Sequence, residues 1–593
     1  MTDYTAPIQD MTFVLNELSG LPEVIARTDC QDASPDLVNA ILEEAGKLAS
    51  EVIAPLNRSG DQTGLTLTEQ HDVIAPDGFK QAWQAYAKGG WGSLQFDPEY
   101  GGQGLPFALA IPVQEMWHAA NMSWGLCPLL TQGAVEAISV NASESLKARY
   151  LPGLISGQWS GTMNLTEPQA GSDLAAITAK AVPEGDHYRI SGQKIFITWG
   201  EHSMAENIIH LVLARLPDAP AGVKGISLFL VPKFLLNDDG SPGQRNDCRA
   251  ISLEHKLGIH ASPTCVMSYG DNDGAIGYLI GEEHRGLACM FTMMNNARLT
   301  VGLQGVSVAD RAYQQARLYA RDRVQGITPG LKTPGPIIHH PDVRRMLMTM
   351  RSLTEAARAL AYLGCREVDM AEASQLTDGE KMRHKRRQAL LTPLVKAWCT
   401  EIAQEVTSLN VQIHGGMGFI EETGAAQLYR DARILPIYEG TNGIQAMDLI
   451  GRKLVFDKGL GLSELLDDVD ASLAEMHSSD QVSAAQLKRV NDSVLTLRTC
   501  SRILLNCEDS SIQNALAMDY LMMMSYVITG WQMLKAADIA GRHLTENPES
   551  DFYQAKTRTC RFYLDQVLPR YLTHAEIINN GANSTLEMDI ALF

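Results

Sequence analysis

The change of hydrophobic spacing along the chain limits the possible folds more than any other feature. Apolar residues recur at helical spacing from Pro35 to Leu154, as in LVNAILEEAGKLASEVIAPLN. From about Ser160 to His284 the pattern changes to short β-rich runs such as KIFITWG and GISLFLVPKF, separated by turns. Helical spacing returns from Gly286 to Leu454 and continues beyond Lys458. The sequence therefore predicts helical, β and helical regions in that order, followed by a further helical segment.

The length agrees with several domains, since a single hydrophobic core stops growing at roughly 250–300 residues and this chain has 593. We expect an α+β multidomain protein with four parts: an N-terminal helical domain (1–159), a central β-barrel-like or sandwich domain (160–284), a helical bundle domain (285–457) and an additional C-terminal helical domain (458–593). The fourth part contains no Gly-rich loop or catalytic cluster, so packing or oligomerisation is its expected role.

Charge and cysteine content exclude several functions. The net charge is −20, and residues 461–593 hold 10 Lys/Arg against 18 Asp/Glu, so we expect no nucleic-acid partner. The 10 cysteines form no C-x-x-C pair, and no zinc spacing is present, so we expect no metal site and a reducing cytoplasm.

No signal peptide is recognisable, and the most apolar stretch, Leu521 to Leu534, is shorter than the roughly 20 residues that cross a bilayer. No membrane association is expected.

Two stretches in the β region carry polar groups at the ends of β runs. In NLTEPQAGSDL, the side chains of Thr166 and Ser172 and the accessible backbone suit a partly anionic ligand, although such a turn is often only a turn. In KIFITWG, Phe196, Thr198 and Trp199 could lie along the edge of a flat ring system. They could equally be ordinary strand residues.

A third stretch, VQIHGGMGF, lies in the second helical region. Gly415, Gly416 and Gly418 permit close approach to the backbone, but no βαβ unit surrounds them, so a Rossmann dinucleotide site is not supported. We expect His414 to be structural.

The fourth stretch, ILPIYEGTNGIQ, places Glu439 just before a helix that Thr441 or Asn442 can cap. The N-terminal N–H groups of that helix favour an anion such as a phosphate. Beside Ile437 and Tyr438 the pKa of the Glu439 carboxyl should rise, as a base that works near neutral pH requires. From this stretch alone, a solvated glutamate at a helix start is an equal alternative.

Together, these stretches resemble the acyl-CoA dehydrogenase family over about residues 35–454. The most specific elements are LTEPQAGSD, QIHGGMGF and RDARILPIYEGTNGIQ. The resemblance implies an FAD enzyme that removes two hydrogens from Cα and Cβ of an acyl-CoA thioester. The residue at Glu439 takes the α-proton, while the β-hydrogen leaves as hydride to flavin N5. The negative charge that develops on the thioester oxygen is stabilised by the glutamate's backbone N–H and a flavin ribityl hydroxyl.

The resemblance also implies roles for other residues. Thr166, Phe196 and Thr198 would contact the flavin ring, and Ser172 both cofactor and substrate. Arg323 would reach the FAD pyrophosphate of a neighbouring subunit, and the adenosine half would lie by Gln412, Gly415, Gly416 and Thr441. The substrate would contact Asn295, Arg298 and Gly440. Two departures are Phe196, where a Trp is common, and DRVQG, which is one residue shorter than the usual loop. Ala297 occupies the position that carries the base in some relatives, so no competing base is present.

The length, the APIQDMTFVLNEL start and the extra C-terminal segment resemble a bacterial subgroup of the family. This implies 3-methylmercaptopropionyl-CoA as the leading substrate, giving methylthioacryloyl-CoA in dimethylsulfoniopropionate demethylation. Ordinary short-, medium- or long-chain acyl-CoA dehydrogenation and an acyl-CoA oxidase are alternatives. A DNA-binding flavoprotein relative and a membrane-docked long-chain enzyme are disfavoured by the acidic C-terminal part. The family also implies electron-transfer flavoprotein as electron acceptor and an oligomer, here a homodimer.

Overall fold

A computed structural model describes the chain apart from residues 1–3, 31–32, 328–329 and 331. The N-terminal part is helical: α1 (Ile8–Phe13), α2 (Leu21–Arg27), α3 (Pro35–Lys47), α4 (Leu56–Thr63), α5 (Phe79–Lys88), α6 (Phe107–Ala120), α7 (Met122–Asn141) and α8 (Glu144–Ile155). Every residue of α6 is buried, so this helix is apolar on all sides rather than along one stripe. It packs against α7 and the long helix α9 (Gly286–Asp322).

The central part is a mainly antiparallel sheet that closes on itself. Its strands are β3 (Trp159–Asn164), β4 (Lys180–Glu184), β5 (His187–Thr198), β6 (Asn207–Arg215), β7 (Ile226–Pro232), β10 (Cys248–Leu253), β11 (Thr264–Tyr269) and β12 (Ala275–Ile280). The order is β10-β11-β5-β12-β7-β6-β3, and β4 joins β5 to β6, which completes a barrel-like ring. The strand β7 is buried along its whole length, because both faces of this part of the sheet are covered, as its continuous apolar sequence requires.

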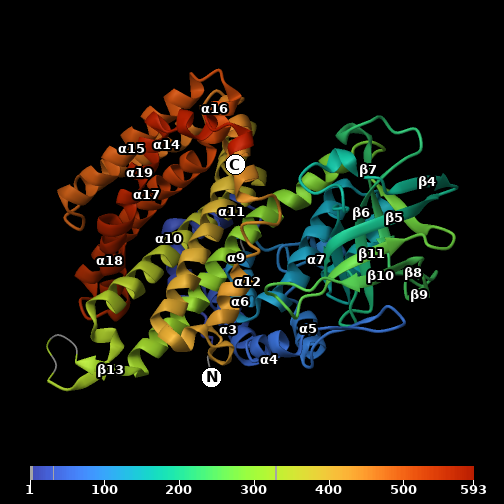
Figure 1. Ribbon diagram of the computed structural model, residues 1–593, viewed down its shortest axis with the longest axis horizontal. Helices are drawn as coiled ribbons and strands as arrows, with labels where there is room; N and C mark the ends of the chain where they lie inside the picture. Colours follow the sequence, from blue (N-terminus) through green and yellow to red (C-terminus); the bar gives the residue numbers. More distant parts are fainter. Residues whose placement is uncertain (1–3, 31–32, 328–329, 331) are drawn as a thin grey trace.

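Three long helices form the centre of the molecule (Figure 1). They are α9, α10 (Pro341–Glu372) and α11 (Asp378–His414), and each packs against the other two. The shorter helices α12 (Ala425–Ala432) and α13 (Asn442–Asp448) follow, and α13 continues as a π-helix, Leu449–Val455. The small hairpin β13 (Val324–Ile327) and β14 (Pro334–Pro336) projects at the far end of α9.

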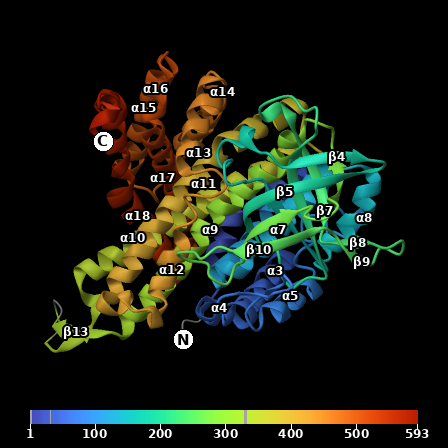
Figure 2. The ribbon, with the colours of Figure 1, turned by 45° about the vertical axis from the view of Figure 1, so that its right-hand side comes forward.

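The C-terminal part adds another helical layer. Its helices are α14 (Leu460–Met476), α15 (Ala484–Leu505), α16 (Ser510–Ala515), α17 (Ala517–Glu546), α18 (Asp551–Phe562), α19 (Tyr571–Asn580) and α20 (Ala582–Leu586). Figure 2 shows these helices on the opposite side of the central bundle from the sheet. Helix α17 joins them to the bundle, since the ring of Tyr526 lies 5.6 Å from that of Trp398 on α11. The predicted fold class is confirmed.

No helix in the described part of the chain is long and apolar enough to cross a membrane. The most apolar C-terminal stretch lies within α17, whose Met523, Met524 and Met533 are buried. These methionines fill the core of the C-terminal layer, a common use of this flexible side chain.

Candidate active site

Glu439 lies in a strained turn between α12 and α13. Its φ of 56° and that of Gly440, 81°, place two successive residues in the left-handed region. A non-glycine residue rarely adopts this conformation, and such strain is concentrated at functional sites. The side chain is half-buried, and its Oε2 makes no hydrogen bond within the part of the chain that the structure describes.

Two cations lie close to this carboxylate. Burial raises the pKa of Glu439 above its ordinary value, and the positive charges of Arg298 on α9 and Lys396 on α11 oppose the rise. Both cations are themselves buried. Burial lowers the pKa of Lys396 to about 7, while the charge of Glu439 raises it. The Glu439 carboxyl group therefore ionises nearer to neutral pH than that of an exposed glutamate. Its Oε2 accepts no hydrogen bond from the described residues.

The turn is fixed to both neighbouring helices. On the α9 side, the hydroxyl of Tyr438 donates to Oε1 of Gln304. On the α11 side, Nζ of Lys396 donates to Oδ1 of Asn442 at 2.8 Å, and Nδ2 of Asn442 donates to Oε1 of Glu401 at 2.8 Å. These contacts place Glu439 between α9 and α11.

Helix α13 begins directly after the turn. Of the two residues that the sequence offered as a cap, Thr441 is the N-cap, and its hydroxyl accepts from the N–H of Ile444 at 3.2 Å. Asn442 is instead buried against α11. Thr441 itself is exposed.

The loop of Thr166 and Ser172 is held against strand β5 by a buried ion pair. Nζ of Lys194 lies 2.8 Å from Oε1 of Glu167, and Glu167 also accepts from the N–H of Thr178 at 2.7 Å. The N–H of Ile195 donates to the carbonyl of Thr166 at 2.9 Å. Thr166 is half-buried and Ser172 exposed at the surface of this loop.

The end of β5 is irregular. Phe196 has a φ of 60° and is 57% exposed, beside a register shift between β5 and β11. Thr198 is half-buried and pairs with Thr264. An exposed aromatic ring next to a hydroxyl at a strained strand end suits a flat ligand.

Of the two interpretations of Trp199, a ligand contact or an ordinary strand residue, the structure favours the second. Its ring is fully buried, and its Nε1 donates to the carbonyl of Ser123 at 3.0 Å. With a φ of 53°, the backbone at Trp199 directs the indole into the core beneath the strand end, so it supports the site from below.

The glycine-rich stretch lies at the end of α11. Gly415 and Gly416 are exposed, and a Cβ at either position would meet no atom within 4 Å. Gln412 is also exposed. The ring of His414 stacks on that of Tyr319 with centroids 4.1 Å apart, and its Nδ1 lies 2.8 Å from the carbonyl of Asn410. Both contacts are structural ones.

The structure separates the candidate residues into two groups. Asn295 and Arg298 lie on the first half of α9, whereas Arg323 follows Asn295 by 28 residues, about 42 Å along a helix. The stack of Tyr319 on His414 places Arg323 and the glycine-rich stretch at the same far end. Arg323 is exposed there, and its Nη2 donates to Oε1 of Gln325 at 3.3 Å. One chain therefore does not bring Arg323 to Glu439.

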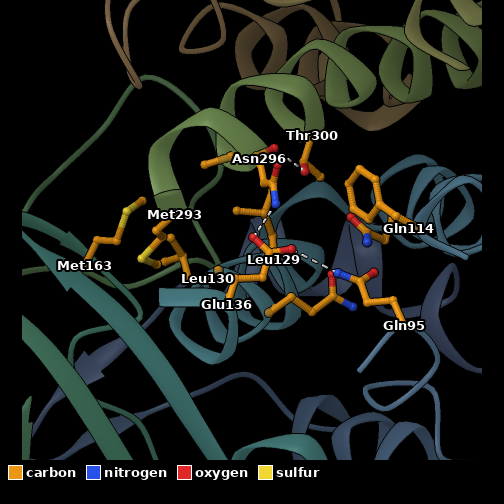
Figure 3. Close-up of a pocket in the computed structure, with 13 residues that line it drawn as sticks. Gln95, Gln114, Leu129, Leu130, Glu136, Met163, Met293, Asn296 and Thr300 are labelled. Atoms are coloured by element: carbon orange, nitrogen blue, oxygen red, sulfur yellow. Dashed lines mark hydrogen bonds between the residues drawn. The ribbon is translucent and has the colours of Figure 1, made fainter. Parts of the chain in front are cut away.

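The β domain meets the first half of α9, the helix that carries Asn295 and Arg298. Met163 at the end of β3 lines the same pocket as Met293 and Ala297 of α9. Thr166 follows Met163 by three residues, and Arg298 directly follows Ala297. Strand β3 and the first half of α9 therefore meet at this pocket (Figure 3).

The residues present fit a flavin nucleotide. An exposed Phe196, the hydroxyls of Thr166 and Thr198, and an unobstructed glycine backbone supply a ring face, polar partners and room for a polyphosphate. Among the described residues, no group of three or more His, Cys, Asp or Glu could hold a metal ion.

Several residues near Glu439 and the Thr166 loop were not predicted from the sequence. Lys396 and Gln304 lie far from Glu439 along the chain, and the Glu167–Lys194 pair joins two different stretches. The one available signal is a lone lysine in the apolar helical run PLVKAWC. A buried lysine requires a partner, so such a residue is a candidate for a functional site.

Four domain families match the chain. "Acyl-CoA dehydrogenase, N-terminal domain" covers residues 37–158, "Acyl-CoA dehydrogenase, middle domain" 162–271, "Acyl-CoA dehydrogenase, C-terminal domain" 284–454, and "Acetyl-CoA dehydrogenase C-terminal like" 465–589. The fourth match coincides with the extra helical layer.

Individual relatives match over almost their whole length. The chain is 47% identical to 3-methylmercaptopropionyl-CoA dehydrogenase of Ruegeria pomeroyi over 98% of each protein. It is 34% identical to a butyryl-CoA dehydrogenase of Syntrophomonas wolfei, over 99% of this chain and 98% of that protein. The solved structure of Caenorhabditis elegans ACDH-11 in complex with C11-CoA shares the fold, with a TM-score of 0.75 at 20% identity over 98% of this chain and 96% of that one. The chain belongs to the acyl-CoA dehydrogenase family of FAD-dependent oxidoreductases.

Proposed function

We propose that Glu439 is the base that removes the α-proton of an acyl-CoA thioester in this enzyme. The observation that carries the proposal is the Oε2 of Glu439, which is buried without a hydrogen-bond partner among the described residues in a carboxyl group whose pKa is raised by burial. Such a group is basic near neutral pH and free to accept a proton. The bound flavin supplies the acceptor for the hydride that leaves Cβ.

The surrounding residues supply binding and charge stabilisation. The N–H of Glu439 donates no hydrogen bond to any described residue, so it can donate to the thioester oxygen as negative charge develops there. Arg298, whose Nε is buried without a hydrogen bond within the described chain, has a donor left for substrate. We assign substrate contacts to this arginine and to Asn295, Gly440 and Ser172.

We assign the flavin ring to Thr166, Ser172, Phe196 and Thr198. We assign the adenosine side to Gln412, Gly415 and Gly416 of one subunit together with Thr441, two residues after Glu439, of the other. Support for two separate groups comes from α9, because Arg323 lies about 42 Å along the helix from Asn295. In a homodimer, Arg323 and the glycine-rich stretch of one subunit would complete the cofactor site of the other. Light scattering that gave a monomer with full flavin content would contradict this assignment.

The proposed substrate is 3-methylmercaptopropionyl-CoA, converted to methylthioacryloyl-CoA by loss of one hydrogen each from Cα and Cβ. The support is the 47% identity with an enzyme of that name over 98% of both proteins. Identity with a butyryl-CoA dehydrogenase is 34%, which makes a short unsubstituted acyl chain the comparison to test.

The substrate test measures turnover of the purified holoenzyme with an artificial electron acceptor. We expect kcat/KM to be higher for 3-methylmercaptopropionyl-CoA than for butyryl-CoA, and lowest for palmitoyl-CoA. Much faster turnover of butyryl- or palmitoyl-CoA would reject the substrate and leave the reaction class intact.

For the physiological electron acceptor we propose electron-transfer flavoprotein rather than oxygen. Hydrogen peroxide should then stay near background during turnover in air. Stoichiometric peroxide would identify an oxidase instead. We also propose a cytoplasmic location, because all ten cysteines are free thiols.

A further inference from the structure

Lys396 is fully buried in α11, in the apolar run PLVKAWC. A charged ammonium group has three N–H donors, and Oδ1 of Asn442, at 2.8 Å, is the one hydrogen-bond acceptor that the described residues give it. A buried charge with unfilled donors is costly, so the neutral amine is favoured. Burial accordingly lowers the pKa of Lys396 to about 7. This lysine can therefore gain and lose a proton near neutral pH.

Lys396 lies on the α11 side of the Glu439 turn, whereas Arg298, assigned to the substrate, lies on α9. Lys396 holds Asn442, which follows Glu439 by three residues, and the charges of the lysine and the glutamate act on each other. The Oε2 of Glu439 is buried and makes no hydrogen bond to a described residue. A proton on this oxygen therefore has a basic group near it, on a different helix from the one assigned to the substrate.

Asn442 connects Lys396 to a carboxylate nearer the surface. Its Oδ1 accepts from Nζ of Lys396 at 2.8 Å, and its Nδ2 donates to Oε1 of Glu401 at 2.8 Å. Glu401 is half-buried, whereas Lys396 is fully buried. The flexible four-carbon side chain of a lysine allows its amino group to change partners, so Nζ can turn from Asn442 to Glu401. The interior at Glu439 is thus linked to a group in contact with solvent.

The charged groups around Lys396 suit a transient positive charge. Glu439 on the turn and Glu401 on α11 stabilise the ammonium form, and Arg298 on α9 destabilises it. When Glu439 gives up a proton it becomes an anion again, which stabilises the charge that Lys396 has just gained. Burial and the charge of Arg298 then favour release of the proton.

We propose that Lys396 is a proton-relay residue, which takes the α-proton from Glu439 and passes it to Glu401 while the product is still bound. The proposal rests on the proposed function, because the relay starts with a proton on Glu439. In the first step the O–H bond at Oε2 breaks and an N–H bond forms at the neutral Nζ. In the second step a proton leaves Nζ for the Glu401 carboxylate and passes from there to water. Both steps move only a proton, and they restore the Glu439 carboxylate and the neutral amine.

The test follows the proton and the flavin in the same experiment. Each holoenzyme is mixed rapidly with 3-methylmercaptopropionyl-CoA, and in parallel with butyryl-CoA, in weak buffer at about pH 8 without an electron acceptor. Flavin absorbance reports the loss of the two hydrogens from the thioester, and a pH-indicator dye reports the proton that reaches solvent. At this pH the lysine of wild type is mostly neutral, as a proton acceptor must be.

Three variants each disable one relay group. Lys396→Met has no basic group, and Lys396→Arg stays protonated because a guanidinium group does not lose its proton in proteins. Glu401→Gln keeps an acceptor for Asn442 but takes no proton. Lys385→Met, which breaks an exposed pair with Glu372, is the control. Thermal melting and flavin content establish that the variants are folded.

In wild type and in the control, we expect proton release to keep pace with bleaching of the flavin. In the three relay variants the flavin should still bleach, but proton release should be about tenfold or more slower than bleaching, because the proton stays in the site until the product leaves. Lys396→Arg keeps a positive charge, so a lag in this variant does not come from a lost charge.

Proton release that keeps pace with bleaching in either folded variant of Lys396 overturns the inference and leaves the proposed function standing. Prompt release in Glu401→Gln, with a lag in both lysine variants, rejects Glu401 as the next acceptor. Glu439→Gln separates the two proposals. If its flavin bleaches at the wild-type rate, Glu439 is not the base, and the proposed function and the relay are both rejected.

Discussion

At the scale of single residues, the proposed base Glu439 lies close to the buried cations Arg298 and Lys396. Burial raises the pKa of the Glu439 carboxyl, and the charges of the buried Arg298 and Lys396 limit that rise. The pKa of Lys396, lowered to about 7 by burial, shows that the lysine also loses its charge easily. The readiness of Glu439 to accept a proton is therefore set by residues of two other helices.

Lys396→Met tests this balance, because it removes the positive charge that Lys396 carries below its pKa of about 7 and keeps a long unbranched side chain. The pKa of Glu439 should rise further, as expected for the loss of a nearby opposite charge. The base is active only when ionised, so the rise of the flavin-reduction rate with pH should move to higher pH. Stopped-flow flavin reduction between pH 6 and 9 measures the shift.

Lys385→Met, on the same helix but in an exposed pair with Glu372, is the matched control and should keep the wild-type profile. If Lys396→Met lowered the rate equally at every pH, Lys396 would act on the structure of the turn rather than on the charge of Glu439.

The sequence identified the catalytic candidates better than their surroundings. Glu439 stands in a motif of consecutive residues, so it could be found by reading along the chain. Lys396 and Gln304 lie near the turn in the fold but belong to helices that precede it by dozens of residues. No local sequence pattern links either residue to Glu439. The role of Trp199 stayed open, because a strand pattern gives no sign of the positive φ at this residue or of the burial of its ring.

At the scale of helices, buried charges connect the two ends of the chain. Lys556 on α18 contacts Asp10 on α1 and lies 2.6 Å from Glu355 on α10. Arg358 contacts Asp10 as well and lies 2.7 Å from Glu115 on α6. All five side chains are buried. Removing one partner of such a network leaves an unpaired charge without water.

Lys556→Met should therefore lower the free energy of unfolding by about 3–5 kcal/mol, the usual cost of an uncompensated buried charge. Thermal and urea denaturation of the holoenzyme measure the loss. Lys488→Met removes an exposed pair with Asp492 on α15 and should change stability by less than about 1 kcal/mol. Equal, small effects of both substitutions would show that the network adds little to stability.

At the scale of the whole molecule, the C-terminal layer is part of the core. Its helix α17 packs on α10 and α11, and Arg570 lies 2.7 Å from Glu405 of α11. Hydrophobic periodicity predicted these helices. The sequence could not show which face they cover, because contacts between residues so far apart depend on the folded arrangement.

A chain that ends at residue 458 should expose the apolar faces of α10 and α11 that α17 covers. We expect it to aggregate or to bind a hydrophobic dye strongly, since large exposed apolar patches favour association. Size-exclusion chromatography with light scattering gives the answer. A monodisperse truncated protein that keeps its flavin and its activity would make the C-terminal layer an independent unit.

The base assignment of Glu439 is tested most directly by flavin absorbance without an electron acceptor. Wild type, Glu439→Gln and the exposed control Glu475→Gln receive 3-methylmercaptopropionyl-CoA, and butyryl-CoA in parallel. Glutamine keeps the shape of the side chain but cannot take a proton. The flavin of Glu439→Gln should therefore be reduced about 10²–10⁴ times more slowly than the flavin of wild type or of the control. Bleaching of Glu439→Gln at the wild-type rate would show that another group removes the proton.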